Sequence, residues 1–506
     1  MKRRDLLKMA AATPALMALS GPAFAQEDRV LNAIMRDATP DIYPYGNSQR
    51  SGLVIAHHVW DALLHRNSET FEHEPLLAES WEWIDDLTIE FKLRQGVTWH
   101  NGDPFTADDV VYTIETIAGP DAKVAVPSNV SWMDHAEKID DFTVRLLLKS
   151  PLPAALDYLT LTTPMLPKKY REEVGADEYS KNPIGCGPYK VTKLSAGAQI
   201  VMEAYDGYYE GSPKGKPAIK TINLRFVPDP TTEQTELLSG GADWAWKITV
   251  DQFDNFSRVP QFTTVAQPTM RVNYMTIDAA GRTGEGNPLT ELKVRQAICH
   301  AIDRETLAKQ LIGKDALIPD SPCFADQLGC EIPGAFYPYD PEKAKALLAE
   351  AGYPDGFETT LVTYQPADVV ASIQAYLADV GIKLNIDRLA VAAAIEKSHA
   401  GEAPLYCASW GSYSIMDVSA ILPVLFGGRA DDYARDPDVM AWIEEGGSTS
   451  DTETRVTSYA KALKKISEDA LIVPLYYSIV NFAFVKELNF KTQADELPRF
   501  YEASWA

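Results

Sequence analysis

The sequence predicts an α/β fold made of two or three lobes. Segments that alternate like half-buried strands are interleaved with segments of helical periodicity along most of the 506 residues. No low-complexity segment or internal repeat interrupts this order. The chain is too long for one simple core, since chains beyond about 250–300 residues divide into domains.

The first half of the chain is predicted to be rich in strands. Helical periodicity over 52–65 follows an opening strand at 30–35. Thr106 and Asp109 are spaced as a capping box, which predicts a helix running from there through Ile117. Further strands are expected at 87–93 and 142–148 and in a β-rich region between Pro183 and Trp244.

The second half is predicted to be richer in helices, with short strands between them. Such an order favours a mixed sheet covered by helices. The last segment, 474–485, is apolar and aromatic, so we expect a buried strand that returns to the first lobe. Helices are expected at 292–312, 341–352, 367–380, 436–447 and 452–470, and strands at 358–363, 382–387 and 404–409.

The N-terminus has the order of a secretory signal peptide. Four basic residues lie within the first eight positions, an apolar run follows over 9–19, and Ala23-Phe24-Ala25 forms a small-x-small triplet. This order predicts cleavage between Ala25 and Gln26. The apolar run is about half of the ~20 residues that a membrane-spanning helix needs.

Arg3-Arg4-Asp5-Leu6-Leu7 also resembles a twin-arginine export signal, with an ordinary secretory signal as the alternative. No cysteine directly follows the cleavage site, so the sequence gives no sign of a lipid anchor. We therefore expect a free periplasmic protein. Removing residues 1–25 takes away four basic residues and one acid, which changes the net charge from −24 to −27. A surface this acidic disfavours nucleic acid as a partner.

Five cysteines are few for a chain of this length. Cys323 and Cys330 lie in one loop and are candidates for a disulfide after export. The other three, Cys186, Cys299 and Cys407, are expected to be small buried hydrophobic residues.

Six blocks of the sequence carry a family pattern, in order along the chain. The most specific are Gly96-Val-Thr-Trp-His-Asn-Gly-Asp-Pro-Phe105, within the block 75–110, and Asn182-Pro-Ile-Gly-Cys-Gly-Pro-Tyr-Lys190. The others lie at 205–213, 237–243, 292–304 and 339–348. Together they resemble the family-5 extracellular solute-binding proteins, which include dipeptide-, oligopeptide- and nickel-binding proteins of ABC importers.

The resemblance implies a two-lobed periplasmic binding protein fold of type II, in the large variant with an extra domain and a ligand cleft between the lobes. It implies lobe I at 26–70, 183–276 and 480–506, the extra domain at 71–182, and lobe II at 277–479. The implied partners are a small-molecule ligand and an inner-membrane ABC permease with its ATPase subunits. We expect a monomer that closes around its ligand by a hinge motion, with no cofactor.

One block departs from the family's pattern. Peptide binders of the family carry W-x-x-D-Y-x-D-P, and the Asp three positions after the Trp pairs with the peptide's ammonium group. Here Trp410 matches, Tyr413 occupies that Asp position, and Asp417 is displaced by one with Val418 in place of the Pro. Recognition of an ordinary dipeptide therefore lacks its charge-assisted partner. Trp410, Tyr413 and Asp417 are all ligand-binding candidates: Trp410 would stack on a ligand or fill the core between the lobes, and Asp417 would bind a cation or cap a helix.

Further ligand-binding candidates come from segments that line the cleft in the family. Trp246 ends a strand after the block 237–243, and Arg271 and Tyr274 lie on the segment that crosses between the lobes. Arg271 would suit a carboxylate or phosphate, with an interface ion pair as the alternative. Tyr45 follows the opening strand, where a plain surface loop is the other interpretation.

Three other functions can be compared with these sequence patterns. A hydrolase is disfavoured because no G-x-S-x-G, S-x-x-K or Cys–His pattern is present, so we expect no enzyme. A metal-chelate carrier would need ligands, and His57, His58 and His65 form no compact set. An opine-, sugar- or chemosensory binding protein of the same fold stays open.

Overall fold

A ten-stranded sheet runs through the whole molecule in the computed structural model, which describes residues 29–39, 41–46, 48–331 and 334–506. The predicted signal peptide, residues 1–25, lies outside the described residues. In spatial order the strands are β14 (Ile382–Arg388), β13 (Phe357–Thr363), β15 (Leu405–Trp410), β12 (Phe262–Ile277), β16 (Ile472–Val485), β11 (Trp244–Trp246), β1 (Leu31–Met35), β10 (Thr221–Phe226), β9 (Gln199–Ala204) and β8 (Tyr189–Ser195).

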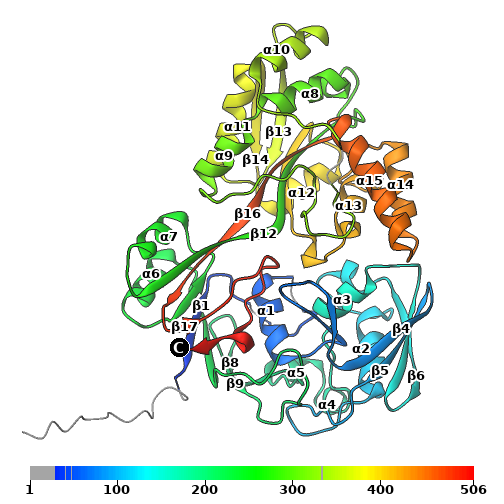
Figure 1. Ribbon diagram of the computed structural model, residues 1–506, viewed down its shortest axis with the longest axis vertical. Coiled ribbons are helices and arrows are strands. Elements are labelled where there is room, and N and C mark those ends of the chain that lie inside the picture. The colour runs from blue at the N-terminus through cyan, green and yellow to red at the C-terminus, as the bar shows by residue number, and fades with distance from the viewer. Residues whose placement is uncertain (1–28, 40, 47, 332–333) are drawn as a thin grey trace, which may run out of the picture.

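Two long antiparallel strands, β12 and β16, join the two lobes (Figure 1). Their lower ends continue the sheet of the first lobe, because β16 pairs with β11. Their upper ends continue the sheet of the second lobe, because β12 pairs with β15. The predicted return of the last long strand to the first lobe is therefore confirmed.

The pairing of β12 and β16 is interrupted where the lobes meet. Pro268 pairs with Ile479 and Val272 with Tyr477, so residues 269–271 lie opposite the single residue Ser478. A bulge of this kind bends a strand and redirects its side chains. Arg271 lies within it.

A separate four-stranded antiparallel sheet fills the predicted extra domain. Its order is β4 (Ala78–Asp85), β5 (Thr88–Leu93), β7 (Thr143–Leu148) and β6 (Met133–Asp140). Helix α2 (Ala107–Ala118) packs against it and begins at Thr106 with the capping box that the sequence predicts. Within 71–182 lie also β3 (His73–Pro75), α3 (Ala155–Leu161), α4 (Lys168–Val174) and α5 (Ala176–Lys181). The remaining elements of the first lobe are α1 (Arg50–Val59), α6 (Pro230–Leu238), α7 (Val250–Ser257), β2 (Leu64–Arg66), β17 (Leu488–Asn489) and β18 (Ser504–Trp505).

Helices cover the sheet of the second lobe, as the order of the sequence predicts. They are α8 (Leu292–Ala301), α9 (Arg304–Leu311), α10 (Pro341–Glu350), α11 (Ala367–Asp379), α12 (Val391–His399), α13 (Leu422–Phe426), α14 (Pro437–Gly447) and α15 (Thr452–Glu468). The single helix expected at 292–312 is wrong. The chain breaks at Ile302, and the Asp303 side chain accepts from Thr306 N to begin α9.

The helix expected over 52–65 is also wrong in its second half. Helix α1 ends at Val59, and Trp60 is extended with φ −120° and ψ 150°. Gly185 lies so close that a Cβ there would be 1.9 Å from the Val59 carbonyl oxygen. Tertiary packing therefore ends α1 at Val59 instead of at residue 65 and frees Trp60 to donate from Nε1 to Tyr179 Oη at 2.8 Å.

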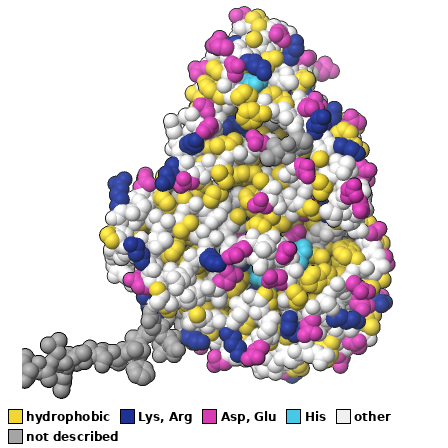
Figure 2. Space-filling view, viewed as in Figure 1, with side chains coloured by type: hydrophobic (Ala, Val, Ile, Leu, Met, Phe, Trp, Pro, Cys, Tyr) yellow, Lys and Arg dark blue, Asp and Glu magenta, His cyan; other side chains and the backbone are white. Residues whose placement is uncertain are grey.

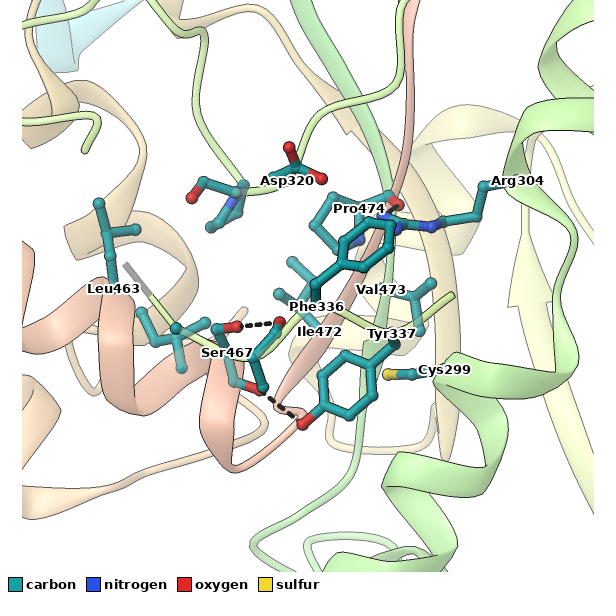
Figure 3. Close-up of a pocket in the computed structure, with 15 residues that line it drawn as sticks. Cys299, Arg304, Asp320, Phe336, Tyr337, Leu463, Ser467, Ile472, Val473 and Pro474 are labelled. Atoms are coloured by element: carbon teal, nitrogen blue, oxygen red, sulfur yellow. Dashed lines mark hydrogen bonds between the residues drawn. The ribbon is translucent and has the colours of Figure 1, made fainter. Parts of the chain in front are cut away.

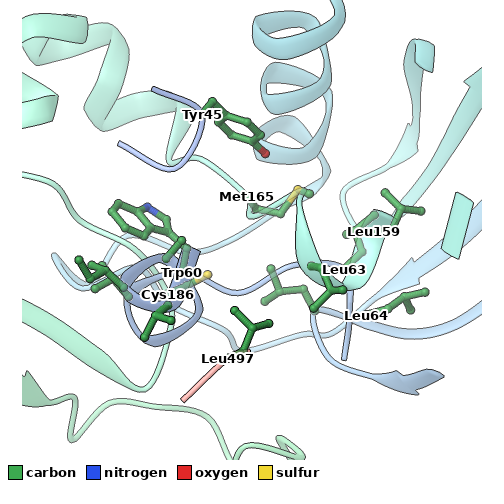
Figure 4. Packing of buried hydrophobic residues seen from close by; sticks show 14 of the residues in the cluster. Tyr45, Trp60, Leu63, Leu64, Leu159, Met165, Cys186 and Leu497 are labelled. Carbon is green, nitrogen blue, oxygen red and sulfur yellow. The ribbon is translucent and has the colours of Figure 1, made fainter. Parts of the chain in front are cut away.

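The core of the first lobe forms where this segment meets distant parts of the chain (Figure 4). Trp60 and Leu63 follow α1, Cys186 comes from the loop before β8, and Leu497 from the C-terminal segment. All four are at most 2% exposed. Burial of such side chains contributes roughly 1.5–3 kcal/mol each, so the C-terminal segment is fixed to the first lobe by packing.

The surface carries charges of both signs. Figure 2 shows acidic and basic side chains interspersed over both lobes. None of the helices in the described part of the chain is long and apolar enough to cross a membrane.

Two histidines, the buried His58 and the half-buried His100, are held in neutral form because removal from solvent disfavours the charged imidazole. His58 Nδ1 lies 2.7 Å from the Val54 carbonyl oxygen, and its Nε2 accepts from Phe500 N at 3.0 Å. His100 Nδ1 accepts from Gly185 N at 3.1 Å, and its Nε2 lies 3.0 Å from the Gly187 carbonyl oxygen. Burial lowers the pKa of His58 to about 3 and that of His100 to about 4.

We predict that the protein loses stability as the pH falls from about 6.5 towards 4. The unfolded chain binds protons on these histidines in that window and the folded chain does not, which costs roughly 1.4 kcal/mol per pH unit for each histidine. Urea unfolding followed by circular dichroism at a series of pH values measures the slope.

His100→Asn removes one titrating group, so its unfolding free energy should depend less steeply on pH below 6.5. The control is His135→Asn, because His135 is exposed beside Asp134, with which it forms a 2.8 Å ion pair. If the unfolding free energy of His100→Asn depended on pH as steeply as that of the wild type, His100 would not be neutral in the folded protein.

Candidate functional site

A cavity of about 310 Å³ lies between the two lobes. Both lobes and the strand that joins them contribute to its wall. The first lobe supplies residues within 44–53, and the predicted extra domain supplies residues within 124–130 and Thr162. The joining strand supplies Arg271, and the second lobe supplies Tyr364, Val391, Ile395 and residues 409–412.

The charged side chains described in this wall are all basic. Arg50 and Arg271 are the charged side chains among its described residues, and no Asp or Glu is found there. The rest is apolar or neutral, with Val124, Val126 and Ile395 among the apolar members. Such a wall suits an anionic group attached to a partly apolar body.

Arg50 is the first residue of α1 and bridges the lobes. Its Nη1 donates to Ser414 Oγ of the second lobe at 3.0 Å. Its Nε lies 3.4 Å from Glu496 Oε2. The Glu496 side chain is only 8% exposed. Burial by itself favours the protonated carboxyl, yet the guanidinium groups of Arg50 and Arg271 hold the pKa of Glu496 below its ordinary value.

Arg271 presents its guanidinium to the cavity from the bulge in β12. Its Nε lies 3.5 Å from Glu496 Oε1, and its side chain is 35% exposed. Nη1 and Nη2 make no hydrogen bond with the described residues. A Cβ on Gly411 would lie 2.9 Å from Nη2, so this glycine makes room for the guanidinium.

A second ion cluster lies behind the cavity wall. Arg66 is fully buried, donates from Nη1 to the Ser414 carbonyl oxygen, and places Nη2 3.0 Å from Asp495 Oδ2. Arg499 donates to both carboxylate oxygens of Asp495, at 2.7 and 3.1 Å. Although burial opposes the charged form, these arginines hold the pKa of Asp495 well below its ordinary value. Asp495 is thereby neutralised within its own cluster.

Three non-glycine residues in these contacts have left-handed backbones: Ser412 with φ 49°, Ser414 with φ 65° and Glu496 with φ 60°. This conformation is uncommon for residues with a Cβ and marks segments whose geometry is imposed by their surroundings. Here it turns the Ser414 oxygens towards Arg50 and Arg66.

Three residues proposed from the sequence lie in the cavity wall: Tyr45, Arg271 and Trp410. Trp410 also donates from Nε1 to the Ala420 carbonyl oxygen at 2.8 Å, which fixes its ring. Tyr45 is 5% exposed and donates to the Pro164 carbonyl oxygen at 2.6 Å. Tyr413, another residue proposed from the sequence, lies in a 3₁₀ turn, Ser412–Ser414, and its side chain is outside what the structure describes.

Asp417, Trp246 and Tyr274 are placed elsewhere, which corrects the expectation that they face the cleft. Asp417 is 2% exposed, because Arg455 Nη2 lies 2.6 Å from its carboxylate and Ser419 N donates to it. Trp246 is fully buried in β11 beside Trp244, with ring centroids 6.2 Å apart. Tyr274 is 4% exposed within the core of the second lobe.

Sequence reasoning missed Arg50, Gly411 and Glu496. Gly411 directly follows Trp410, so its place beside the cavity could have been proposed. Arg50 and Glu496 lie 446 positions apart, and neither belongs to a sequence motif that would mark it as a ligand-binding residue. Only the return of the C-terminal segment brings them together.

A disulfide supports the segment that follows the cavity loop. Cys323 and Cys330, the pair singled out from the sequence, are joined with Cα atoms 5.9 Å apart. Gln327, inside the closed loop, donates to the Ile415 carbonyl oxygen at 2.7 Å. The three other cysteines are free and buried, as expected.

A smaller cavity of about 140 Å³ lies within the second lobe (Figure 3). Two of its polar side chains are engaged with the protein itself. Arg304 donates to the carbonyl oxygens of Pro319 and Pro474, and Tyr337 donates to that of Ser467. Of these two cavities, the one between the lobes is lined by described residues of both lobes, so we take it as the candidate ligand site.

A metal site is not apparent in the described ranges. No group of three His, Cys, Asp or Glu side chains there is placed to hold a metal ion. His58 uses both ring nitrogens for hydrogen bonds to the backbone, as described above.

Comparison with known proteins identifies the class. Two relatives are the glutathione-binding protein GsiB of Pectobacterium atrosepticum, 26% identical over 92% of this chain and 91% of the relative, and di/tripeptide-binding protein 2 of Pseudomonas aeruginosa, 29% identical over 78% and 79%. The family model described as bacterial extracellular solute-binding proteins, family 5 Middle, matches residues 72–432.

Solved structures agree on the fold. HbpA2 of Haemophilus parasuis superposes with a TM-score of 0.83 at 24% identity, over 94% of this chain and all of that one. The ABC transporter substrate-binding protein CtaP of Listeria monocytogenes gives 0.84 at 23% identity, over 95% of this chain and all of the other. The two-lobed fold and the family match lead to one conclusion: the chain belongs to the family-5 bacterial extracellular solute-binding proteins.

Proposed function

We propose that this solute-binding protein is the substrate-binding component of an ABC importer for a peptide, or a related small polar solute, that carries a carboxylate. The observation that carries the proposal is the charge of the cavity between the lobes. Arg50 and Arg271 line it, and no acid does so among the described residues. A carboxylate fits the planar donor edge of an arginine, whose paired N–H groups match its two oxygens.

The relatives support a peptide-like ligand. Their names assign them glutathione and di- or tripeptides, which carry a free carboxylate. The apolar side chains of the cavity wall can accept the body of such a ligand. At the position where the family's peptide binders pair with the ligand ammonium, this chain has Tyr413, so we propose that recognition depends on the carboxylate and not on the amino group.

Closure of the lobes would complete the site. We propose that lobe I (26–70, 183–276 and 480–506) and lobe II (277–479) rotate about β12 and β16, with the domain 71–182 moving with lobe I. Support comes from the cavity wall, since a ligand there touches both lobes and the bulge that carries Arg271. A ligand that binds the closed form more tightly shifts the equilibrium towards it.

The setting of the protein follows from the N-terminal pattern and the family. We propose export by a signal peptide cleaved after Ala25, in which Arg3 and Arg4 act as a twin-arginine signal, and a monomer free in the periplasm. It would deliver its ligand to an inner-membrane permease with ATPase subunits. The family consists of binding proteins, and we propose that this chain also binds without chemical turnover.

The proposal predicts that a free carboxylate decides binding. Isothermal titration with alanyl-leucine, trialanine and glutathione, each as free acid and as C-terminal amide, should show the acids binding more tightly. Loss of a charge-assisted bond costs roughly 1.5–3 kcal/mol, or about 10- to 150-fold in affinity. N-acetylation should change affinity little, and Arg271→Met should abolish the preference for the acid.

Asp417→Asn is the control, because it breaks a buried pair with Arg455 outside the cavity wall. It should lower the unfolding free energy while the folded protein keeps the preference for the acid. Amides that bind as tightly as acids would refute the carboxylate assignment.

Gly411 lies so close to Arg271 that a side chain there should weaken ligand binding. Gly411 has φ −107° and ψ 12°, which alanine also adopts, so Gly411→Ala should leave the unfolding free energy nearly unchanged. Its new methyl group would displace the guanidinium and weaken binding of the free acid by about tenfold. Gly447→Ala, in α14 and outside the cavity wall, is the matched control, because a Cβ there would meet only Tyr459 Oη at 3.7 Å, and it should keep wild-type affinity. Wild-type affinity in Gly411→Ala would show that Arg271 does not contact the ligand.

A further inference from the structure

Glu496 stands between the two arginines of the cavity without lining the cavity itself. One carboxylate oxygen lies 3.4 Å from Arg50 Nε and the other 3.5 Å from Arg271 Nε. The three residues come from α1, from the bulge in β12 and from the C-terminal segment. The carboxylate is thus a fixed counter-ion shared by the two groups that face a ligand.

The neighbouring charges do not alter this balance. Arg66 and Arg499 face two carboxylates, Asp495 and Asp157, so their charges balance. Lys247, whose field also reaches Glu496, forms its own ion pair with Asp37 at 2.7 Å. Two arginines and one glutamate leave a single positive charge at the cavity.

That single charge has a consequence for selectivity. A ligand head with one negative charge brings the group of Arg50, Arg271 and Glu496 to neutrality. A head with two negative charges leaves one charge uncompensated in a site from which closure removes water, where unpaired charge is costly.

We propose that Glu496 determines specificity: it restricts the site formed by Arg50 and Arg271 to ligand heads with one negative charge. The carboxylate does so by cancelling one of the two guanidinium charges. This inference rests on the proposed function. Phosphate-like heads are rejected by charge, although their oxygens could reach the same donors. Replacing Glu496 by an uncharged residue should therefore admit them.

The test compares two tetrahedral heads that differ in charge and little in shape. Alanyl-alanine is used with its C-terminal carboxylate replaced by a sulfonate, with one negative charge, or by a phosphonate, which approaches two at pH 8.5. Isothermal titration should show that the wild-type protein prefers the sulfonate. In Glu496→Gln the phosphonate-to-sulfonate affinity ratio should rise by about tenfold or more, since a unit charge near the site is removed.

Glu502→Gln is the matched control. Glu502 lies in the same C-terminal segment and faces Arg499 at 3.8 Å, away from the cavity, so the same change of net charge should leave the ratio unaltered. The double variant Arg50→Gln with Glu496→Gln restores the charge at the cavity and should return the ratio towards that of the wild type.

The outcomes separate the two proposals. A wild-type protein that prefers the phosphonate, a measurement that needs no variant, would overturn the role of Glu496. An unchanged ratio in Glu496→Gln would also overturn it. If the wild type bound C-terminal amides as tightly as free acids, the proposed function itself would have failed.

Discussion

The antiparallel pairing of β12 and β16 is the constraint on which the rest of the structure depends. These two strands complete the sheet of each lobe and carry the connection between them. Their pairing is broken only around residues 269–271 and at Asn273, and the first interruption coincides with the cavity. A hinge of two paired strands holds the lobes in register, while the bulge gives one residue, Arg271, a direction that a regular strand would not allow.

Charge is arranged around this hinge in two layers. The inner layer, Arg66, Asp157, Asp495 and Arg499, is buried, and its two positive and two negative charges are paired with one another. The outer layer, Arg50, Arg271 and Glu496, has one guanidinium charge in excess and faces the cavity. Buried ion pairs contribute little net stability because desolvation offsets their attraction, so their value here is geometric. The inner layer fixes the C-terminal segment, and that segment positions the counter-ion of the outer layer.

Family membership and ligand choice depend on different parts of this molecule. The blocks that identify the family mostly form turns, helix caps and close backbone contacts, such as the approach of Gly185 to Val59. The cavity wall is built from other residues, which can change without disturbing those contacts. The fold can therefore be shared with proteins that bind different ligands, and the ligand has to be argued from the site.

The sequence by itself determined the class, the α/β fold, most helices and strands, the capping box at Thr106 and the pair Cys323 and Cys330. The class came from the resemblance of six sequence blocks to a known family. The other features are local or depend on short-range patterns, so periodicity and spacing are enough to find them. It misplaced the end of α1, where the stop comes from packing against Gly185, which lies far along the chain.

Only the tertiary structure decided which residues meet at the cavity. The carboxylate of Asp417 has the right chemistry to bind a ligand, but Arg455 from α15 pairs with it in the core of the second lobe. Glu496 has no motif, and it becomes important because the chain returns to the first lobe through β16 and brings it beside Arg50 and Arg271. Contacts between segments hundreds of residues apart leave no periodic trace in a single sequence, and in this protein such contacts form the site.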